Sequence, residues 1–217
     1  MITATYIDSM GSDLSVVNAA RVSFGKSSQL VFTDDPDDYG SLSERDTKLI
    51  NYLAKHKHIS PFGHAFASFH VKAPIFVARQ LVKHKFLRWN EISRRYVDDE
   101  PEFYTPDVWR GRSADKKQGS EGIVYTTSEP EFVNYTALRI YKAMIEEGVA
   151  PEQARMVLPQ STMTEWYWSG SLDAFASMCV LRLKGDTQYE TRLVAQQIDE
   201  VMSGLFPVSW KALVQKS

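Results

Sequence analysis

Residues 79–96 form the sequence RQLVKHKFLRWNEISRRY, which gathers six cationic side chains in eighteen positions. The 217-residue chain has a formal net charge of −2, so this local excess of positive charge indicates an anionic partner. The stretch follows the apolar run 74–78, so its charges are expected to begin where a helix ends. Asn90, Glu91 and Ser93 add donors and acceptors suited to reading a base, and the cations suit a phosphate.

Two other interpretations of this stretch are open. Runs of charge are often only the solvated face of a helix and the loop after it. Alternatively, residues 79–95 could be the basic patch of a nucleic-acid-binding module in which Trp89 and Tyr96 stack on bases. The slightly acidic chain argues against general nucleic-acid binding, which usually comes with a basic domain.

The composition is typical of a globular protein, with 43% hydrophobic and 24% charged residues. The length and apolar content fit one large domain, expected over residues 1–217. No apolar run approaches the roughly 20 residues that a membrane helix needs. Residues 1–13 lack the basic start and apolar centre of a signal peptide. The expected location is therefore cytoplasmic, in a bacterium or in a host cell if the source is viral.

The chain has one cysteine, so neither an internal disulfide nor a cysteine zinc site is expected. Helical spacing of apolar residues in 171–183 places Cys179 on the side that faces the core. His56, His58, His64 and His70 are close in sequence but lack the spacing of a ligand pair such as H-E-x-x-H. No metal site is therefore expected.

Hydrophobic periodicity and turn residues predict a mixed α/β (α+β) domain. Polar composition predicts loops at 26–41 and 111–122, the second of them mobile. Asp13 and Ser128 are expected to cap helices. Strands are expected at 1–7, 65–72 and 162–169, and helices at 13–23, 43–57, from residue 74, and at 128–147, 151–158, 171–183 and 188–205. The helix at 128–147 is expected to bury Val133, Ala137, Ile140, Tyr141 and Met144.

The segment 83–96 resembles the signature of the flavin-dependent thymidylate synthases. That signature is Arg-His-Arg, two residues, Ser, one residue, Asn, further positions that include Ser, and then Arg-Tyr. The positions that match are His84, Asn90, Glu91, Ser93, Arg95 and Tyr96. The resemblance extends to the turn at 58–64 (HISPFGH), to the run at 69–80 (FHVKAPIFVARQ), and to the surroundings of Arg155 and Arg182.

The resemblance implies FAD as cofactor, with NADPH or NADH to reduce it, because no amino-acid side chain supplies a hydride. The cofactor contacts that it implies are Ser23, His58, Ser60, Lys83, His84, Lys85, Asn90, Glu91, Ser171 and Ser177.

The resemblance also implies methylation of dUMP to dTMP with 5,10-methylenetetrahydrofolate as carbon donor. Classical thymidylate synthases use a cysteine nucleophile, and here a guanidinium against the uracil carbonyl and N3 edge would polarise the ring instead. That catalytic role falls to Arg182. The substrate contacts implied are Gln80, Glu91, Ile92, Ser93, Arg94, Arg95, Arg155 and Arg182.

For the structure, the resemblance implies a central, mostly antiparallel sheet flanked by helices. It also implies a homotetramer whose active sites are shared between subunits, which would explain why the candidate residues are spread from residue 23 to residue 192.

This chain departs from the family pattern at several positions. The signature has arginines where this chain has Lys83 and Lys85. The lysines keep the charge but lack the bidentate donor fork of arginine. Arg88 stands for a serine and Gly63 for a glutamate. Where the family often has Asn, Arg and Asn, this chain has Ser171, Asp173 and Ser177. A dUMP hydroxymethylase or a UMP-specific relative is therefore a second interpretation.

Overall fold

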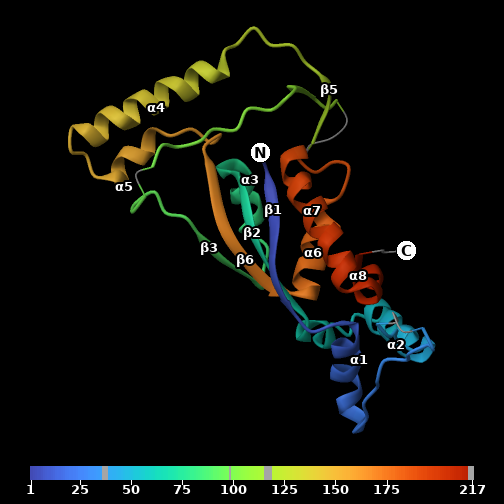
Figure 1. The fold of residues 1–217 in the computed structure, drawn as a ribbon. Helices are drawn as coiled ribbons and strands as arrows, with labels where there is room; N and C mark the ends of the chain where they lie inside the picture. The colour runs from blue at the N-terminus through green and yellow to red at the C-terminus, as the bar shows by residue number, and fades with distance from the viewer. Residues whose placement is uncertain (36–38, 98, 115–118, 215–217) are drawn as a thin grey trace.

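The computed structural model describes residues 1–35, 39–97, 99–114 and 119–214, and a four-stranded sheet lies at its centre. The strands are β1 (Thr3–Met10), β2 (Phe66–Pro74), β6 (Met163–Ser171) and β3 (Leu87–Glu91), side by side in the order β1-β2-β6-β3. Every neighbouring pair is antiparallel. The expected antiparallel sheet flanked by helices is therefore confirmed (Figure 1).

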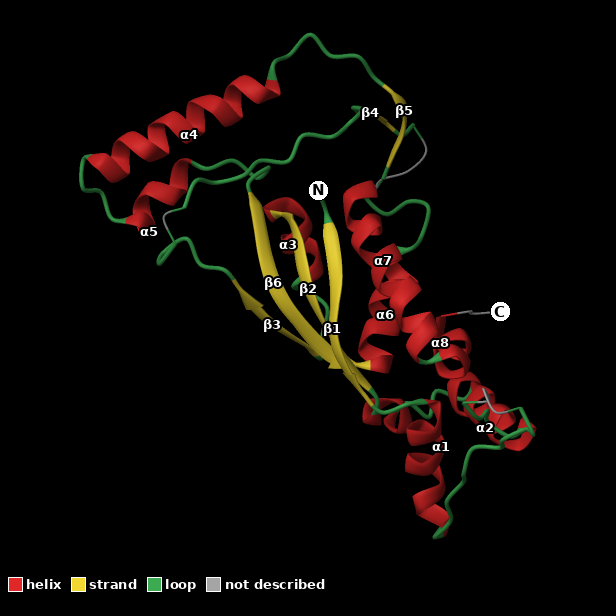
Figure 2. Ribbon diagram, in the orientation of Figure 1, coloured by secondary structure: helices red, strands yellow, loops and turns green. Residues whose placement is uncertain are grey.

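The helices lie beside this sheet and beyond both of its ends (Figure 2). In chain order they are α1 (Asp13–Arg21), α2 (Glu44–Lys55), α3 (Ile75–Leu81), α4 (Pro130–Glu146), α5 (Pro151–Ala154), α6 (Leu172–Arg182), α7 (Tyr189–Leu205) and α8 (Pro207–Val214). Short 3-10 turns lie at Val22–Phe24, Ser60–His64 and Arg155–Val157. None of the helices in these described ranges is long and apolar enough to cross a membrane.

The core lies between one face of the sheet and the helices α6 and α7. Alternation along the two central strands decides this face, since Phe69 of β2 pairs with Trp168 of β6 and Val71 pairs with Trp166. All four side chains are at most 1% exposed. Phe175 of α6 meets Phe69 and Trp168 edge to face, at 5.3 and 5.5 Å between ring centroids. Burying each such side chain contributes about 1.5–3 kcal/mol.

Two regions contain strands that the sequence did not predict. Leu87–Glu91 forms the edge strand β3, where half-buried Leu87 and Trp89 alternate with exposed Arg88 and Asn90. Within the expected mobile loop 111–122, Arg110–Arg112 (β4) and Ser120–Ile123 (β5) pair as a hairpin, so that expectation was wrong at the strands. Residues 115–118 of the expected loop lie outside the described residues. The expected loop at 26–41 carries one isolated bridge, between Val31 and Ser41, and its residues 36–38 also lie outside the described part.

Two expected helix caps were wrong. Ser12, not Asp13, is the N-cap of α1. The buried Asp13 carboxylate instead accepts hydrogen bonds from the backbone N–H groups of Val208 and Ser209, each at 2.9 Å. It therefore satisfies donors at the start of α8 and ties the two ends of the chain together. At α4 the N-cap position is occupied by Glu129 rather than Ser128.

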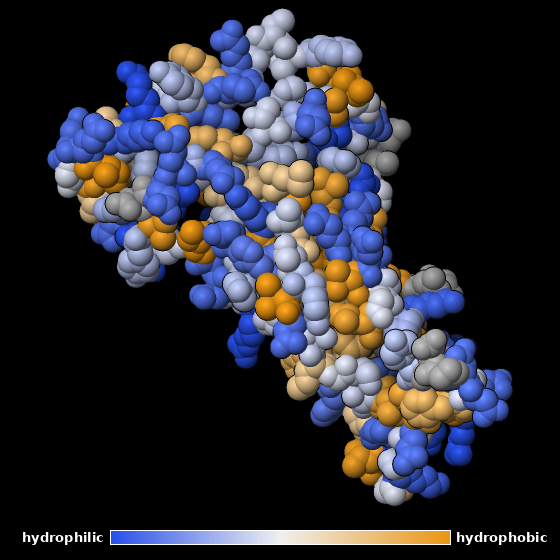
Figure 3. Space-filling model, viewed as in Figure 1, coloured by the Kyte–Doolittle hydropathy of each residue, from blue (hydrophilic) through white to orange (hydrophobic). Residues whose placement is uncertain are grey.

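Helix α4 is less buried than its sequence predicts. Ala137 and Tyr141 are buried as expected, but Val133 is 56% and Ile140 41% exposed. The helix lies with α5 in an arm on the far side of the sheet from α6, α7 and α8 (Figure 1). Apolar (orange) patches are visible on the surface of this single copy, including at its narrow lower end (Figure 3). The amphipathic stripe of α4 is therefore covered only in part by its own chain.

Candidate active site

Arg182, the last residue of α6, joins two other predicted site residues. Its Nε donates to Nε2 of His84 at 3.0 Å, and its Nη2 donates to the backbone carbonyl of Gln80 at 3.2 Å. Gln80 lies in α3, and His84 lies in the turn between α3 and β3. The C-terminus of a helix favours a cation, so α6 also supports the charge of Arg182.

The surroundings of this contact determine the protonation state of both His84 and Arg182. Burial, together with the neighbouring Arg182 charge, lowers the pKa of His84 to about 4. The imidazole is therefore neutral near pH 7 and offers the Nε2 lone pair to Arg182. Burial also lowers the pKa of Arg182, but a guanidinium stays protonated in proteins. Arg182 is thus a fixed cation held by two neutral acceptors.

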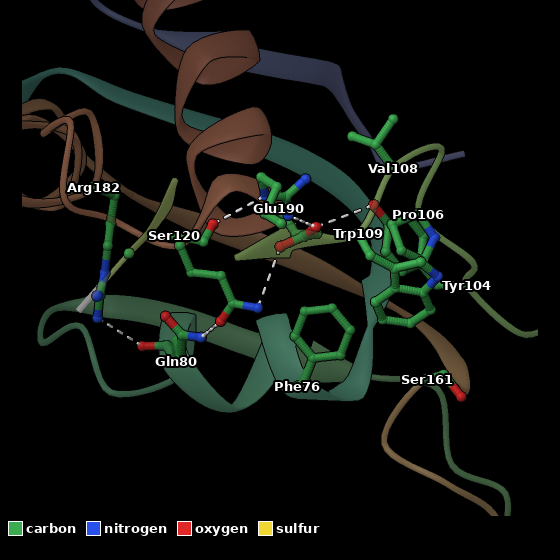
Figure 4. Close-up of a pocket in the computed structure, with 13 residues that line it drawn as sticks. Phe76, Gln80, Tyr104, Pro106, Val108, Trp109, Ser120, Ser161, Arg182 and Glu190 are labelled. Carbon is green, nitrogen blue, oxygen red and sulfur yellow. Dashed lines mark hydrogen bonds and ion pairs between the residues drawn. The ribbon is translucent and has the colours of Figure 1, made fainter. Parts of the chain in front are cut away.

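Arg182 and Gln80 border a cavity of about 820 Å³, called here the Arg182 pocket. Its walls come from α3, the start of α7 and the segment that leads into the β4–β5 hairpin (Figure 4). The lining includes Phe76, Gln80, Tyr104, Trp109, Arg110, Ser120, Arg182, Gln188 and Glu190. Its volume lies in the range of small-molecule sites, and its lining combines aromatic surface with convergent polar groups.

A hydrogen-bonded chain of side chains runs along one wall of this pocket. Gln80 Nε2 donates to Gln188 Oε1, and Gln188 Nε2 donates to Glu190 Oε2 at 3.2 Å. Glu190 Oε1 accepts from the Tyr104 hydroxyl at 3.3 Å and forms an ion pair with Arg110. Sequence reasoning did not assign Gln188, Glu190, Tyr104 or Arg110 to the site. The available signal was Gln188 and Glu190, which follow Arg182 as they do in the resembled family.

A second candidate region consists of two adjoining cavities, called here the Asp173 groove. One cavity, of about 590 Å³, is lined by the predicted residues Ser60 and Ser171 and by Arg88. The other, of about 710 Å³, is lined by the predicted Ser177 and by Lys55, Lys57 and Lys211. Both share Ile59 and Asp173, and the buried Oδ1 of Asp173 has no hydrogen-bond partner among the described residues. A buried acceptor of this kind needs a donor.

The signature residue Glu91 is anchored to the sheet. Its carboxylate accepts from Thr164 Oγ1 at 2.6 Å and from Trp89 Nε1 at 3.1 Å. The Trp89 ring is stacked on Trp166 at 4.2 Å between centroids and is half-buried. One face of the Trp89 ring is therefore already covered by Trp166, which argues against Trp89 as a base-stacking residue.

The rest of the signature forms a turn after β3. The backbone N–H of Ile92 donates to Glu165 O at 2.9 Å, and Arg94 Nη1 donates to Asp99 O at 2.6 Å. Ile92 and Arg94 line a smaller cavity of about 150 Å³. Ser93 Oγ accepts from both N and Nε of Arg95, at 3.3 and 3.2 Å.

The remaining predicted residues do not line the Arg182 pocket. Arg155 follows α5, where its Nε donates to Glu152 O at 3.2 Å. Ser23 lies just after α1, at the opposite end of the molecule from α5 (Figure 1). His58, Lys83, Lys85 and Asn90 are exposed. One copy of the chain thus brings together only part of the predicted set.

The histidines near α2 pack with each other and with an aromatic ring. His56 lies 4.3 Å and His58 6.0 Å from the Tyr52 ring, measured between centroids. Across the described ranges, no group of three or more His, Cys, Asp or Glu side chains is arranged to hold a metal ion.

Cys179 belongs to the core, as predicted. It is fully buried, its Sγ donates to Ala195 O at 3.7 Å, and burial raises the pKa of its thiol well above the ordinary value. A buried thiol with a raised pKa is a poor nucleophile.

The basic signature lies beside the sheet and Arg182 lies at a cavity, whereas Cys179 is buried in the core away from that cavity. This arrangement fits an enzyme that modifies a nucleotide without a cysteine nucleophile. Residues 5–208 match the family model described as "Thymidylate synthase complementing protein". The chain belongs to the flavin-dependent thymidylate synthase family, so the predicted family is confirmed, and it is an enzyme of the flavin-dependent methyltransferase class.

Curated relatives and solved structures agree with this family. The chain is 40% identical over 209 residues to a flavin-dependent thymidylate synthase of Thermus thermophilus. This alignment covers 95% of this chain and 73% of that protein. It is 37% identical over 219 residues to the flavin-dependent thymidylate synthase of Kosmotoga olearia, and this alignment covers 96% of this chain and 88% of that protein. The UMP/dUMP methylase PolB from Streptomyces cacaoi, solved with 5-Br UMP, superposes with a TM-score of 0.81 at 30% identity, over 98% of this chain and 93% of PolB.

Proposed function

We propose that this chain catalyses the reductive methylation of dUMP to dTMP. In this proposal 5,10-methylenetetrahydrofolate donates the carbon, NADPH is the reductant and FAD is the cofactor. The observation that carries the proposal is Arg182, a cation held by His84 and Gln80 at the edge of a ligand-sized cavity. The single cysteine is buried elsewhere in the core.

Arg182 would activate the pyrimidine electrostatically. Carbon 5 of uracil becomes nucleophilic when negative charge moves toward the carbonyl and N3 edge of the ring. A guanidinium has five N–H donors, and His84 and Gln80 occupy only Nε and one position on Nη2. No other acceptor among the described residues meets Arg182, so its remaining N–H groups can stabilise that charge, in an orientation that the two acceptors fix in advance.

The Asp173 groove fits FAD, which when bound would supply the hydride that reduces the one-carbon unit. The unpartnered Oδ1 of Asp173 can accept from a ribose hydroxyl or an adenine amino group. Arg88 on one side and the three lysines on the other provide cations for the pyrophosphate. Ser60, Ser171 and Ser177 add hydroxyls along the groove. We assign Ser23, His58, Lys83, His84, Lys85, Asn90 and Glu91 to the rest of the cofactor site.

The nucleotide phosphate would be held by Arg95 and Arg155, with Arg94 and the backbone of Ser93, whereas Ile92, whose backbone N–H is bonded to Glu165 O, would support this turn from the sheet. Arg155 is in the α4–α5 arm and Arg182 is at the end of α6. A complete site would then combine residues of different copies, as in a homotetramer with shared active sites. The exposed apolar residues of α4 support this proposal, because exposed apolar patches often mark contacts between subunits.

UMP is a second candidate substrate for a specific reason. PolB, the structural relative, is titled a UMP/dUMP methylase and has been solved with both 5-Br UMP and 5-Br dUMP. A chain with 30% and 31% identity to those structures could accept either sugar.

The test is mass spectrometry of an equimolar mixture of dUMP and UMP after incubation with the protein, FAD, NADPH and methylenetetrahydrofolate. We expect a methyl gain on dUMP. A hydroxymethyl gain would make the chain a hydroxymethylase, and a methyl gain on UMP alone would make it a UMP-specific enzyme. No change in either nucleotide would contradict the proposed function.

A further inference from the structure

We propose that Glu190 is a positioning residue that makes the Arg182 pocket select uracil over cytosine. It would act by fixing the orientation of two amide side chains, Gln188 and Gln80. The inference rests on the proposed function, because it takes a pyrimidine nucleotide as the ligand of this pocket.

Glu190 is part of the lining of the Arg182 pocket but is only 3% exposed, and hydrogen bonds link it to the other polar side chains of the wall. It accepts from Gln188 Nε2 at 3.2 Å, and Gln188 Oε1 accepts from Gln80 Nε2. We call Glu190, Gln188 and Gln80 the amide relay. Figure 4 shows the relay leading to Gln80, whose backbone carbonyl accepts from Arg182.

Two donors hold Glu190 as the acceptor end of this relay. Arg110 forms an ion pair with it, and arginine can only donate. The Tyr104 hydroxyl donates to it at 3.3 Å, and burial together with Glu190 raises the pKa of Tyr104 to about 12. Tyr104 therefore stays protonated, and the Glu190 carboxylate accepts hydrogen bonds from Tyr104, Arg110 and Gln188.

An acceptor at one end gives the whole relay one direction. A carboxylate has no hydrogen to donate, so Gln188 must turn its NH₂ group toward Glu190 and its oxygen toward Gln80. Gln80 must then turn its own NH₂ group toward Gln188. Thr191 Oγ1 also lies 3.3 Å from Gln80 Oε1, but a hydroxyl both donates and accepts and cannot set the direction. Glu190 is thus the group that orients Gln80.

This direction determines what the pocket can recognise. Gln80 keeps a second N–H on Nε2, for which the described residues provide no further partner, and Arg182 is also a donor. The pocket therefore offers donors, which match the carbonyl oxygens of uracil. Cytosine has an amino group in place of the 4-carbonyl, so two donors would face each other and remain unpaired. A turned Gln80 would present oxygen and accept that amino group.

The test measures binding rather than turnover. Isothermal titration calorimetry with the FAD-loaded full chain compares dUMP with dCMP, for the wild type and for Glu190→Gln. The glutamine has nearly the same shape but can both donate and accept, so it no longer fixes the relay. We expect the wild type to prefer dUMP, and the ratio of the two dissociation constants to fall by about tenfold in Glu190→Gln, as for one mispaired hydrogen bond.

Two further variants separate orientation from simple structural support. Gln188→Met interrupts the relay and keeps the Glu190–Arg110 pair, so it should lower the ratio as well, even if Glu190→Gln fails to fold. Thr191→Val keeps the shape of the side chain and removes the other contact of Gln80 without changing the relay direction, so the ratio should be retained.

An unchanged ratio in folded Glu190→Gln and Gln188→Met, or equal weakening of both nucleotides, would overturn the inference. Absence of dUMP binding to the wild type would instead overturn the proposed function on which the inference rests.

Discussion

Arg182 depends on acceptors that its own chain supplies from two separate positions. A lysine keeps the positive charge but not the planar fork that donates to His84 and Gln80 at once. We expect Arg182→Ala to lower the rate of methyl transfer by roughly 100-fold or more, as when one stabilising donor is removed from an active site. Arg182→Lys should retain only part of the wild-type rate of methyl transfer. The rate of dTMP formation measures both, and retained flavin absorbance shows that the cofactor site is intact.

His84 gives a pH prediction at the same scale. The imidazole of the unfolded chain binds a proton below about pH 6.5, whereas in the folded chain it does so only near the lowered pKa of about 4. Its contribution to stability is therefore present above about pH 6.5 and is lost as the pH falls toward 4. We expect the free energy of unfolding to fall less between pH 7 and pH 5 in His84→Gln than in the wild type, by urea denaturation. If the free energy of unfolding fell equally in the two proteins, the neutral imidazole of His84 would be contradicted.

At this scale the sequence predicts part of the site. The resemblance supplied Arg182, His84 and Gln80, and the structure brings these three together. It did not supply Tyr104 and Arg110, which lie more than 75 positions before Glu190 and meet it only after folding. For Glu190 the family resemblance was the available signal, because a carboxylate at the start of α7 is also what a helix dipole favours.

The elements of the sheet depend on close approach as well as on alternation. Gly170 of β6 pairs with Leu87 of β3, and a Cβ there would displace the Leu87 side chain and lie 3.1 Å from the backbone Phe86 O, so both neighbours would have to shift. Gly170→Ala should therefore lower the free energy of unfolding by about 1–3 kcal/mol, as overpacking does. Urea denaturation measures this change.

Gly204→Ala is the matched control for that substitution. Gly204 lies in α7, and a Cβ there would meet nothing within 4 Å. This variant should be neutral or slightly stabilising, because alanine is the better helix former. Equal stability of the two variants would show that β3 and β6 are not tightly packed at Gly170.

The long strands and helices were predictable from the sequence because their buried residues recur with a regular period. β2 and β6 have alternating buried residues, and α7 has a buried stripe at Val194, Ile198 and Met202. β3 was missed because Arg88 and Glu91 hide a short alternation in a run of charge. The β4–β5 hairpin was missed because its strands contain Gly111 and Gly122, residues that normally indicate a loop.

For the whole molecule, the distribution of predicted residues leads to a test of shared sites. Arg155 and Arg182 belong to different parts of one copy, the arm and the end of α6. If each site combines these residues from different copies, a refolded mixture of Arg155→Ala and Arg182→Ala should regain part of the wild-type rate, although each variant alone has a strongly lowered rate. A mixture no more active than its components would contradict sharing between copies.

The central claim for the molecule is that methyl transfer depends on Arg182 and not on Cys179. The most direct measurement is mass spectrometry of dUMP after incubation with FAD, NADPH, methylenetetrahydrofolate and the wild type, Cys179→Ala or Arg182→Ala. We predict a methyl gain with the wild type and with Cys179→Ala, and none with Arg182→Ala, because the thiol is fully buried and the guanidinium borders the pocket. A methyl gain that persists in Arg182→Ala but is lost in a folded Cys179→Ala would contradict the account.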